Sequence, residues 1–199
     1  MADIKDVIFS RRSIRWFKKE PVPDKDIDDI ISAGIRAPTA SAGEQWHFVC
    51  VTSEENRKKM LSFIKKGQMA YLSRALRSAP AKNEIDKWNE MFVKGIYDAP
   101  AYIIGLLDYS TRTLNDEYIN YERMWGIESV TLALGNMMLL AWSKGYGTVF
   151  IAVPKFYEED LKESLGLPAK MEYAGMLALG KPAEMPELKP RKPLKITKI

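Results

Sequence analysis

The sequence of 199 residues has one histidine and one cysteine, which excludes most hydrolytic chemistry. They cannot furnish the usual zinc ligand sets or an evident Ser-His-Asp triad, so we expect no metal. His47 lies in the apolar run HFVCV at 47–51, which predicts a buried strand and favours a core imidazole over a catalytic base. Cys50 has no partner for an internal disulfide bond, which fits a reducing compartment and predicts a cytoplasmic protein.

Three other absences narrow the function. The run GYG at 145–147 lacks the rest of a dinucleotide-binding or P-loop glycine pattern. No apolar run approaches the ~18 residues that a membrane helix needs, so no membrane partner is expected. The net charge is +4, but the 30 Lys and Arg are interspersed with 26 Asp and Glu and concentrate only at the two ends. This distribution favours a small anionic ligand over nucleic acid.

Hydrophobic periodicity predicts one domain over 1–199 that contains both helices and strands. Helices are expected over 3–9, from an N-cap at Asp24 to a stop before Pro38, from 53–55 onward, and over 118–144. The last of these has apolar and small residues on more than one side, which favours burial in the subunit centre or at an interface. Strands are expected over 47–51, 101–107, 148–152 and 173–179.

Two segments do not fit this regular pattern. Residues 67–97 mix helical turns with basic and aromatic residues and form a candidate lid. The prolines of residues 183–199 predict an extended tail.

The stretch SRRSIRWF at 10–17 carries three arginines within five positions. In an extended segment Arg11, Ser13 and Arg15 would share one face, while Ile14 and Trp16 would point toward a core. Guanidinium groups hold phosphate oxygens bidentately, and a serine hydroxyl adds a donor. Taken alone, the stretch is equally consistent with a solvated basic turn between two helices.

Six segments, in this order, decide between these readings: RRSIRWF at 11–17, APTASAGEQWHFV at 37–49, DAPAYIIG at 98–105, SKGYGTVFI at 143–151, MLALGKP at 176–182 and KPRKPL at 189–194. With them the chain resembles the FMN-dependent nitroreductase family nearly from end to end. The resemblance implies an α+β, nitroreductase-like fold in which helices flank a central, antiparallel-rich sheet. It also implies an intertwined homodimer with FMN at the interface.

The resemblance also implies which residues hold the cofactor. Arg11, Arg12, Ser13 and Arg15 would bind the phosphate and ribityl chain of FMN, joined by Lys189 and Arg191 of the tail. The flavin ring would lie along Phe150, Ile151, Ala152 and Val153 and would meet Pro38, Thr39, Ala40 and Ala42 of the other subunit. No catalytic side chain is assigned, because the flavin carries the chemistry.

One segment departs from the family pattern. Relatives often show Asn and then Gln-Pro-Trp where this chain has Ala42 and then Glu44-Gln45-Trp46. Polar contacts to the flavin ring are therefore missing here or supplied differently, which leaves the redox tuning open. Trp46 itself is expected to be a core residue.

The function implied is transfer of electrons from NADH or NADPH through FMN to a nitroaromatic, a quinone or another conjugated acceptor, by a ping-pong mechanism. A flavin-binding storage or sensing protein with little turnover is the alternative. A nucleic-acid-binding module that uses both basic ends is a third and weaker reading. The sequence names neither the physiological acceptor nor the preferred dinucleotide.

Overall fold

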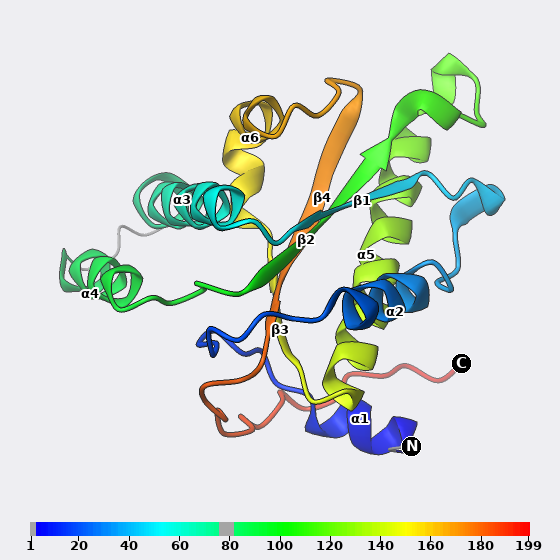
Figure 1. Cartoon of the computed structure of the whole chain (residues 1–199). Helices are drawn as coiled ribbons and strands as arrows, with labels where there is room; N and C mark the ends of the chain where they lie inside the picture. Colours follow the sequence, from blue (N-terminus) through cyan, green and yellow to red (C-terminus); the bar gives the residue numbers. More distant parts are fainter. Residues whose placement is uncertain (1–2, 76–81) are drawn as a thin grey trace.

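The computed structural model describes residues 3–75 and 82–199 and has an α+β architecture (Figure 1). Its helices are α1 (Ile4–Ser10), α2 (Asp24–Gly34), α3 (Glu54–Ala70), α4 (Lys82–Val93), α5 (Ile119–Ser143) and α6 (Glu158–Ser164). Its strands are β1 (Trp46–Val51), β2 (Ala101–Asp108), β3 (Gly147–Ile151) and β4 (Met171–Gly180). Short 3₁₀ turns cover Ala40–Ala42, Tyr109–Thr111, Asp116–Tyr118 and Val153–Tyr157, and a π turn covers Tyr71–Ala75.

The strands form one sheet in the order β1-β2-β4-β3, and each neighbouring pair is antiparallel. β1 and β3 are therefore the edges. The segment after α1 lies along the β3 edge, where Ser13 forms a parallel bridge with Thr148 and Ile14 N donates to Thr148 O at 3.0 Å. This contact brings the arginine-rich segment to the sheet.

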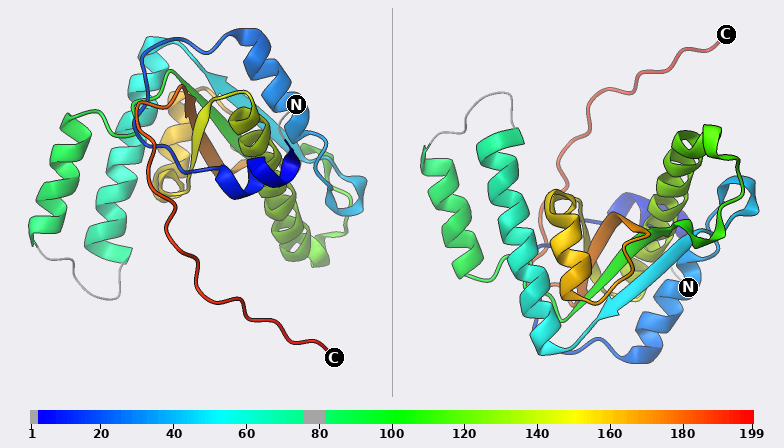
Figure 2. Two further views of the ribbon diagram at one scale, coloured as in Figure 1. Left: turned by 90° about the horizontal axis from the view of Figure 1, so that it is seen from below. Right: turned by 90° about the horizontal axis from the view of Figure 1, so that it is seen from above.

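Helices cover both faces of the sheet (Figure 1). α2 and α5 bury Ile30 and Leu134 against one face, and α3 and α6 bury Ile64 and Leu161 against the other. Because β2 lies between two helical layers, its side chains are buried along almost the whole strand. Both views of Figure 2 show α4 beside α3 on the side away from the sheet, and the C-terminal tail leaving the body of the chain.

Helix α5 carries apolar residues around most of its circumference. One side packs on the sheet through Val130 and Leu134, while Tyr121, Met124 and Leu132 are exposed on the other. Contrary to the expectation from apolar runs, the span Asp116–Ser143 is long and apolar enough to cross a membrane by length and composition alone. One side of the helix is buried between α2 and the sheet, as expected for 118–144, and the opposite side is exposed.

The structure corrects four of the expectations from sequence. The strand at 47–51 is only partly buried and His47 is not a core residue: β1 is an edge strand in which Val51 is buried while His47 and Cys50 are exposed. Helix α2 begins at Asp24 with Pro23 at the N-cap, one residue earlier than expected. Residues 67–97 are mostly helical where they are described, in α3, the π turn and α4, while 76–81 lie outside the described residues. Helix α6 was not anticipated, because its short charged sequence has little periodicity.

Candidate functional site

The arginine-rich segment lies between β3 and the residues that follow β4. Ile14 is fully buried, as the predicted alternation requires, whereas Arg11, Ser13 and Arg15 are half-buried. Farther along the segment, Phe17 forms an antiparallel bridge with Pro182, and Lys18 N donates to Lys181 O at 2.9 Å. The backbone of the segment is thus fixed at Ser13–Ile14 and again at Phe17–Lys18, which gives the side chains between them a defined position.

The guanidinium groups of Arg11, Arg12 and Arg191 lie close together, and no carboxylate pairs with them in the described residues. Burial, then repulsion from Arg191 and Arg12, lowers the pKa of Arg11. Arg11 Nη1 and Arg12 Nε are buried and have no hydrogen-bond partner. Within residues 3–75 and 82–199, no ion pair involves any of these arginines. A buried donor without a partner and several positive charges close together each raise the free energy of the folded protein. A bound phosphate would accept these hydrogen bonds and offset the charge, so the donor set fits a phosphate.

The sequence did not point to Thr148, whose hydroxyl is a third orphaned donor beside this cluster. Its side chain is 1% exposed and Oγ1 has no hydrogen-bond partner. Thr148 is the residue bridged to Ser13. A threonine inside an expected strand carries no signal of its own, because threonine is common in strands.

The tail contributes one of its two predicted ligands to this cluster. Both Lys189 and Arg191 are exposed, but the positive charge of Arg191 lies near enough to Arg11 to lower the pKa of Arg11. Where the tail starts, Ala183 N donates to Trp16 O at 2.9 Å and Arg15 N donates to Glu184 Oε1 at 3.0 Å. These two bonds tie the start of the tail to the arginine segment.

The predicted ring-binding residues 150–153 lie on the same edge of the sheet. Phe150 comes two positions after Thr148, Ile151 is buried, and Ala152 is exposed where the strand ends. Val153 starts the 3₁₀ turn that packs on α3. There Gly67 leaves no room for a side chain, because a Cβ atom would lie 2.3 Å from Val153 O. The structure therefore brings the arginine segment and 150–153 together.

The predicted segment from Pro38 to Ala42 lies elsewhere in the same chain. Ala40 N donates to Ser129 Oγ at 3.2 Å, which fixes the segment to the first half of α5. Figure 1 shows this light-blue loop beyond the C-terminal end of α2, beside the upper part of α5, whereas the dark-blue segment that follows α1 lies near the lower end of α5. Within one chain, therefore, residues 38–42 and the arginines are far apart.

The loop that contains residues 38–42 has an unusual backbone. Ser41, Ala42 and Glu44 have φ values of 52°, 51° and 44°, in the left-handed region that non-glycine residues rarely occupy. Glu44 N donates to Thr39 Oγ1 at 3.1 Å, a bond that closes the loop. Strain of this kind persists only where surrounding contacts hold it, and it clusters at functional sites.

Gln45 and Glu122 supply such contacts, and the sequence did not identify them as a pair. Their side chains are 7% and 3% exposed, and Gln45 Nε2 donates to Glu122 Oε1 at 3.1 Å and to Thr111 O at 2.9 Å. Burial opposes ionisation of Glu122, but bonds from the Thr113 N–H and from Arg112 outweigh it and lower its pKa. Gln45, one of the residues that departs from the family pattern, therefore points into the protein and anchors the strained loop.

Comparison with protein families decides the classification. The model of the nitroreductase family matches residues 8–181. The chain belongs to the nitroreductase family. This match, together with the antiparallel sheet flanked by helices, confirms the family and the fold class that the sequence indicated.

Individual relatives of this nitroreductase family member align over nearly its whole length. YfhC of Bacillus subtilis is 28% identical over 194 residues, which cover 96% of this chain and 91% of the relative. The FMN reductase [NAD(P)H] of Bacillus subtilis is 29% identical over 203 residues, 97% of this chain and 71% of the relative. The structure of a nitroreductase with bound FMN from Bacteroides fragilis has a TM-score of 0.72 at 24% identity and covers 100% of both chains, which shows a shared fold.

A cavity of about 430 Å³ adjoins Ala152 and brings charged residues of α5 and β4 to the end of β3. At its centre Glu172 accepts hydrogen bonds from Tyr109 Oη at 2.6 Å, Arg123 Nε at 2.7 Å and Lys155 Nζ at 2.7 Å. Burial alone would raise the pKa of Glu172, but these bonds outweigh it and hold the pKa at about 2. The cluster fixes the turn after Ala152 to the sheet.

We expect Glu172→Gln to lower the free energy of unfolding at pH 7 by about 1–3 kcal/mol, because it weakens hydrogen bonds to a mostly buried group. The native pKa lies below the ordinary value of 4.5, so this contribution is complete above pH 4.5 and is lost as the pH falls toward about 2. Denaturant unfolding between neutral and acidic pH measures it, with the exposed Glu163→Gln as control. A difference that does not change with pH would contradict the assignment.

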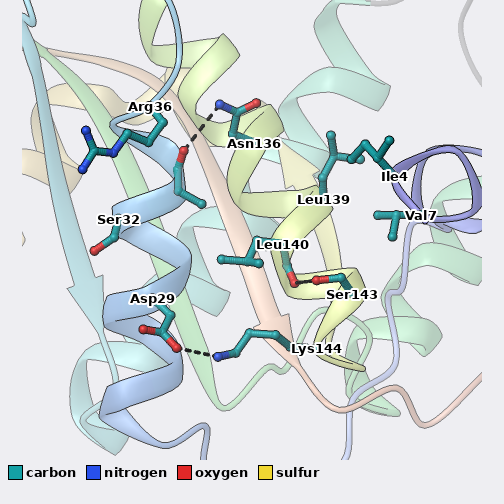
Figure 3. A pocket seen from close by; sticks show the side chains of 11 residues that line it. Ile4, Val7, Asp29, Ser32, Arg36, Asn136, Leu139, Leu140, Ser143 and Lys144 are labelled. Atoms are coloured by element: carbon teal, nitrogen blue, oxygen red, sulfur yellow. Dashed lines mark hydrogen bonds and ion pairs between the residues drawn. The ribbon is translucent and has the colours of Figure 1, made fainter. Parts of the chain in front are cut away.

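A second cavity, of about 820 Å³, lies between α1, α2 and α5 and contains none of the predicted cofactor ligands (Figure 3). Several of its polar groups are paired within the lining: Lys144 Nζ donates to Asp29 Oδ2 at 2.6 Å, Ser143 Oγ donates to Leu140 O at 2.8 Å, and Asn136 Nδ2 donates to Ala33 O at 3.4 Å. The rest of the lining is largely apolar and includes Ile4. A lining in which apolar side chains and paired polar groups predominate suits contact with another protein surface better than a polar cofactor.

Proposed function

We propose that the protein is an FMN-dependent NAD(P)H oxidoreductase. The observation that carries this proposal is the cluster of Arg11, Arg12 and Arg191 at the sheet edge that continues into 150–153, in which Arg11 and Arg12 have buried donors without a hydrogen-bond partner. A phosphate would satisfy the donors and neutralise the charge. The names of the relatives, which include an FMN reductase, support the same cofactor.

In this proposal the residues of the chain bind and orient, and no side chain acts as a dedicated acid or base. FMN, when bound, supplies the redox chemistry by accepting a hydride and passing electrons on. Arg11, Arg12, Ser13 and Arg15 would hold its phosphate and ribityl chain, with Lys189 and Arg191 of the tail. Phe150, Ile151, Ala152 and Val153 would border the ring.

A homodimer completes the site, because residues 38–42 lie apart from the arginines of their own chain. Apolar side chains that a second copy can cover are exposed on α1 and α5, among them Ile8 at 52%, Phe9 at 69% and Leu132 at 51%. The cavity of about 820 Å³ lies between these two helices and extends the surface. A two-fold axis through α5 would bring the strained loop of one subunit to the flavin of the other.

The electron acceptor is proposed to be a nitroaromatic, a quinone or another conjugated molecule that takes turns with the dinucleotide in one pocket. The helices and turns of 67–97, apart from residues 76–81, project from the sheet beside the 3₁₀ turn that follows β3 (Figure 2). We propose this segment as the lid that sets acceptor size. A cytoplasmic location stays a prediction from cysteine usage.

Flavin titration followed by anaerobic reduction tests the proposal. The purified protein is expected to bind FMN stoichiometrically, and NADH or NADPH is expected to bleach its visible absorption within the time of catalytic turnover. An electron acceptor should then restore the absorption. Protein that takes up no FMN would contradict the proposal, and protein that binds FMN but is reduced slowly would favour the storage or sensing alternative.

A further inference from the structure

A groove between α3, the π turn and the turn after β3 carries positive charge that its own walls do not balance. Its volume is about 310 Å³, and its polar lining residues are Ser62, Lys65, Lys66, Ser73, Arg74 and Tyr157. Met69 and Ala70 complete the lining, which contains no aspartate or glutamate. We refer to these residues as the basic groove.

The cations of the basic groove are available to an external anion. In the part of the chain that the structure describes, no ion pair involves Lys65, Lys66 or Arg74. Earlier on the same helix, Lys58 pairs with Glu54 at 2.6 Å and Lys59 with Glu55 at 2.8 Å. The lysines in the first half of α3 are therefore paired with glutamates, whereas those near its C-terminal end are not. This difference makes the groove distinct from an ordinary solvated helix face.

The spacing along α3 gathers the groove residues on one side. At 3.6 residues per turn, positions 62, 65, 66, 69 and 70 fall within one sector of α3, and Ser73 and Arg74 follow in the π turn. Lys66 is further oriented by the ring of Phe63, whose centroid lies 5.5 Å from Lys66 Nζ. Lys65, Lys66 and Ser62 on this face, with Arg74 of the π turn beside it, are a donor set for phosphate oxygens. The Ser73 hydroxyl instead donates to Met69 O at 2.7 Å.

The groove is also close to the proposed flavin site. Gly67 contacts Val153, the last of the predicted ring-binding residues, with no space for a side chain between them. The groove starts at the adjacent position of the helix surface, where Ala70 and Lys66 flank Gly67, and Tyr157 of the same 3₁₀ turn forms its other wall. Since an α-helix with its side chains is about 10 Å across, the groove lies within roughly that distance of Val153.

We propose that the basic groove binds the phosphate groups of the dihydronicotinamide donor. This inference rests on the proposed function, since it places the donor beside the flavin. NADH carries a pyrophosphate and NADPH a further phosphate on the adenosine ribose, and both lie away from the nicotinamide that reacts. The FMN phosphate has its own arginines on the β3 edge, so a separate cationic site near Val153 suits a second phosphate-bearing ligand.

The test compares donors with and without phosphate on the FMN-loaded protein. The variant is Lys65→Gln, Lys66→Gln and Arg74→Gln together, and the matched control is Lys58→Gln with Lys59→Gln on the same helix. Anaerobic stopped-flow reduction gives the dissociation constant and the limiting rate for NADH, for NADPH and for benzyl dihydronicotinamide, which has no phosphate. Because these substitutions are on an exposed helix face, we expect both variants to fold and to hold FMN.

The triple variant should raise the dissociation constant for NADPH at least about tenfold, since the loss of even one hydrogen bond to a charged group has about this effect. Reduction by benzyl dihydronicotinamide should not change, and the control variant should bind all donors as the wild type does. A larger effect on NADPH than on NADH would place the ribose phosphate in the groove, and equal effects would place the pyrophosphate there.

Unchanged affinity for both dinucleotides in the triple variant would overturn the inference while leaving the proposed function intact. An equal loss of reduction by the donor without phosphate would also overturn it, because the residues would then act on the flavin. If no donor reduces the wild-type protein, the proposed function fails, and equilibrium binding of NADP⁺ still tests the groove. Weaker binding to the triple variant alone would then support the groove, and equal binding to wild type and variant would exclude it.

Discussion

Replacing Arg11 with methionine is expected to weaken FMN binding by about 1.5–3 kcal/mol, the range for hydrogen bonds to charged groups. The buried Nη1 of Arg11 has no partner in the protein, and its pKa is lowered by burial and by the positive charges of Arg191 and Arg12. A bound phosphate would accept a hydrogen bond from Nη1 and would offset the repulsion between the arginines. Methionine keeps the apolar stem, so the substitution removes charge with little loss of packing.

The flavin-free protein should respond in the opposite direction. Without an anion, the Arg11 charge is repelled by its neighbours, so Arg11→Met should leave the free energy of unfolding of the apo protein unchanged or increased. The stabilisation that FMN adds should fall, since a ligand stabilises in proportion to its affinity. Fluorescence titration and thermal unfolding with and without FMN measure the two effects.

Two controls separate the phosphate from the rest of the flavin. Lys58→Ala removes one positive charge from an exposed helix position and should not change FMN affinity. Riboflavin, which has no phosphate, should bind wild type and Arg11→Met equally. Arg15→Ala and Arg191→Ala are expected to weaken FMN binding by a similar amount, and all three variants should turn over when flavin is in excess. Equal losses for FMN and riboflavin would show that Arg11 does not act on the phosphate.

The arginine segment was predictable from sequence because its information is local. Alternation in an extended stretch places Ile14 in the core and the arginines on the other side, and the structure buries Ile14 completely. The long helix was equally clear, since α5 is apolar over many turns and is followed by Gly145, whose φ of 82° ends the helix. Both features depend on neighbours in the chain, which a sequence displays directly.

The order of strands in the sheet depends on contacts between distant parts of the chain, and here the sequence wrongly predicted that β1 is buried. The runs at β1 and β2 are both apolar, but β2 lies between two strands and two helical layers, whereas β1 has one neighbour. The exposure of His47 follows from this long-range arrangement. The bond between Gln45 and Glu122 joins residues 77 positions apart, so neither could be recognised as an anchor of the strained loop before the fold was known.

The working unit is expected to be a homodimer in which each flavin site takes residues from both chains. The reason is geometric: the arginines lie at the β3 edge, while residues 38–42 are fixed to α5 by the bond from Ala40 N to Ser129 Oγ at 3.2 Å. Separated monomers should therefore lose FMN. They should also be less stable, because apolar residues of α1 and α5 would return to water.

Mixing two defective chains tests this arrangement. One chain carries Arg15→Ala in the phosphate segment, and the other carries Ala42→Asp in the loop. Ala42 has a φ of 51°, and aspartate is among the residues that tolerate this backbone, so the second change should add a carboxylate beside the ring without unfolding the loop. Each homodimer has one defect in every site, so both should bind FMN poorly.

In the mixed dimer, one site receives both defects and the other receives neither. Co-expression with two different affinity tags, followed by purification through both, should yield a dimer that binds about one FMN with wild-type affinity. Arg15→Ala paired with Arg15→Ala under different tags is the matched control and should show no such recovery. If all site residues came from one chain, the mixed dimer would contain two impaired sites, and no site of wild-type affinity would appear. A monomer by light scattering that still holds stoichiometric FMN would exclude the shared site altogether.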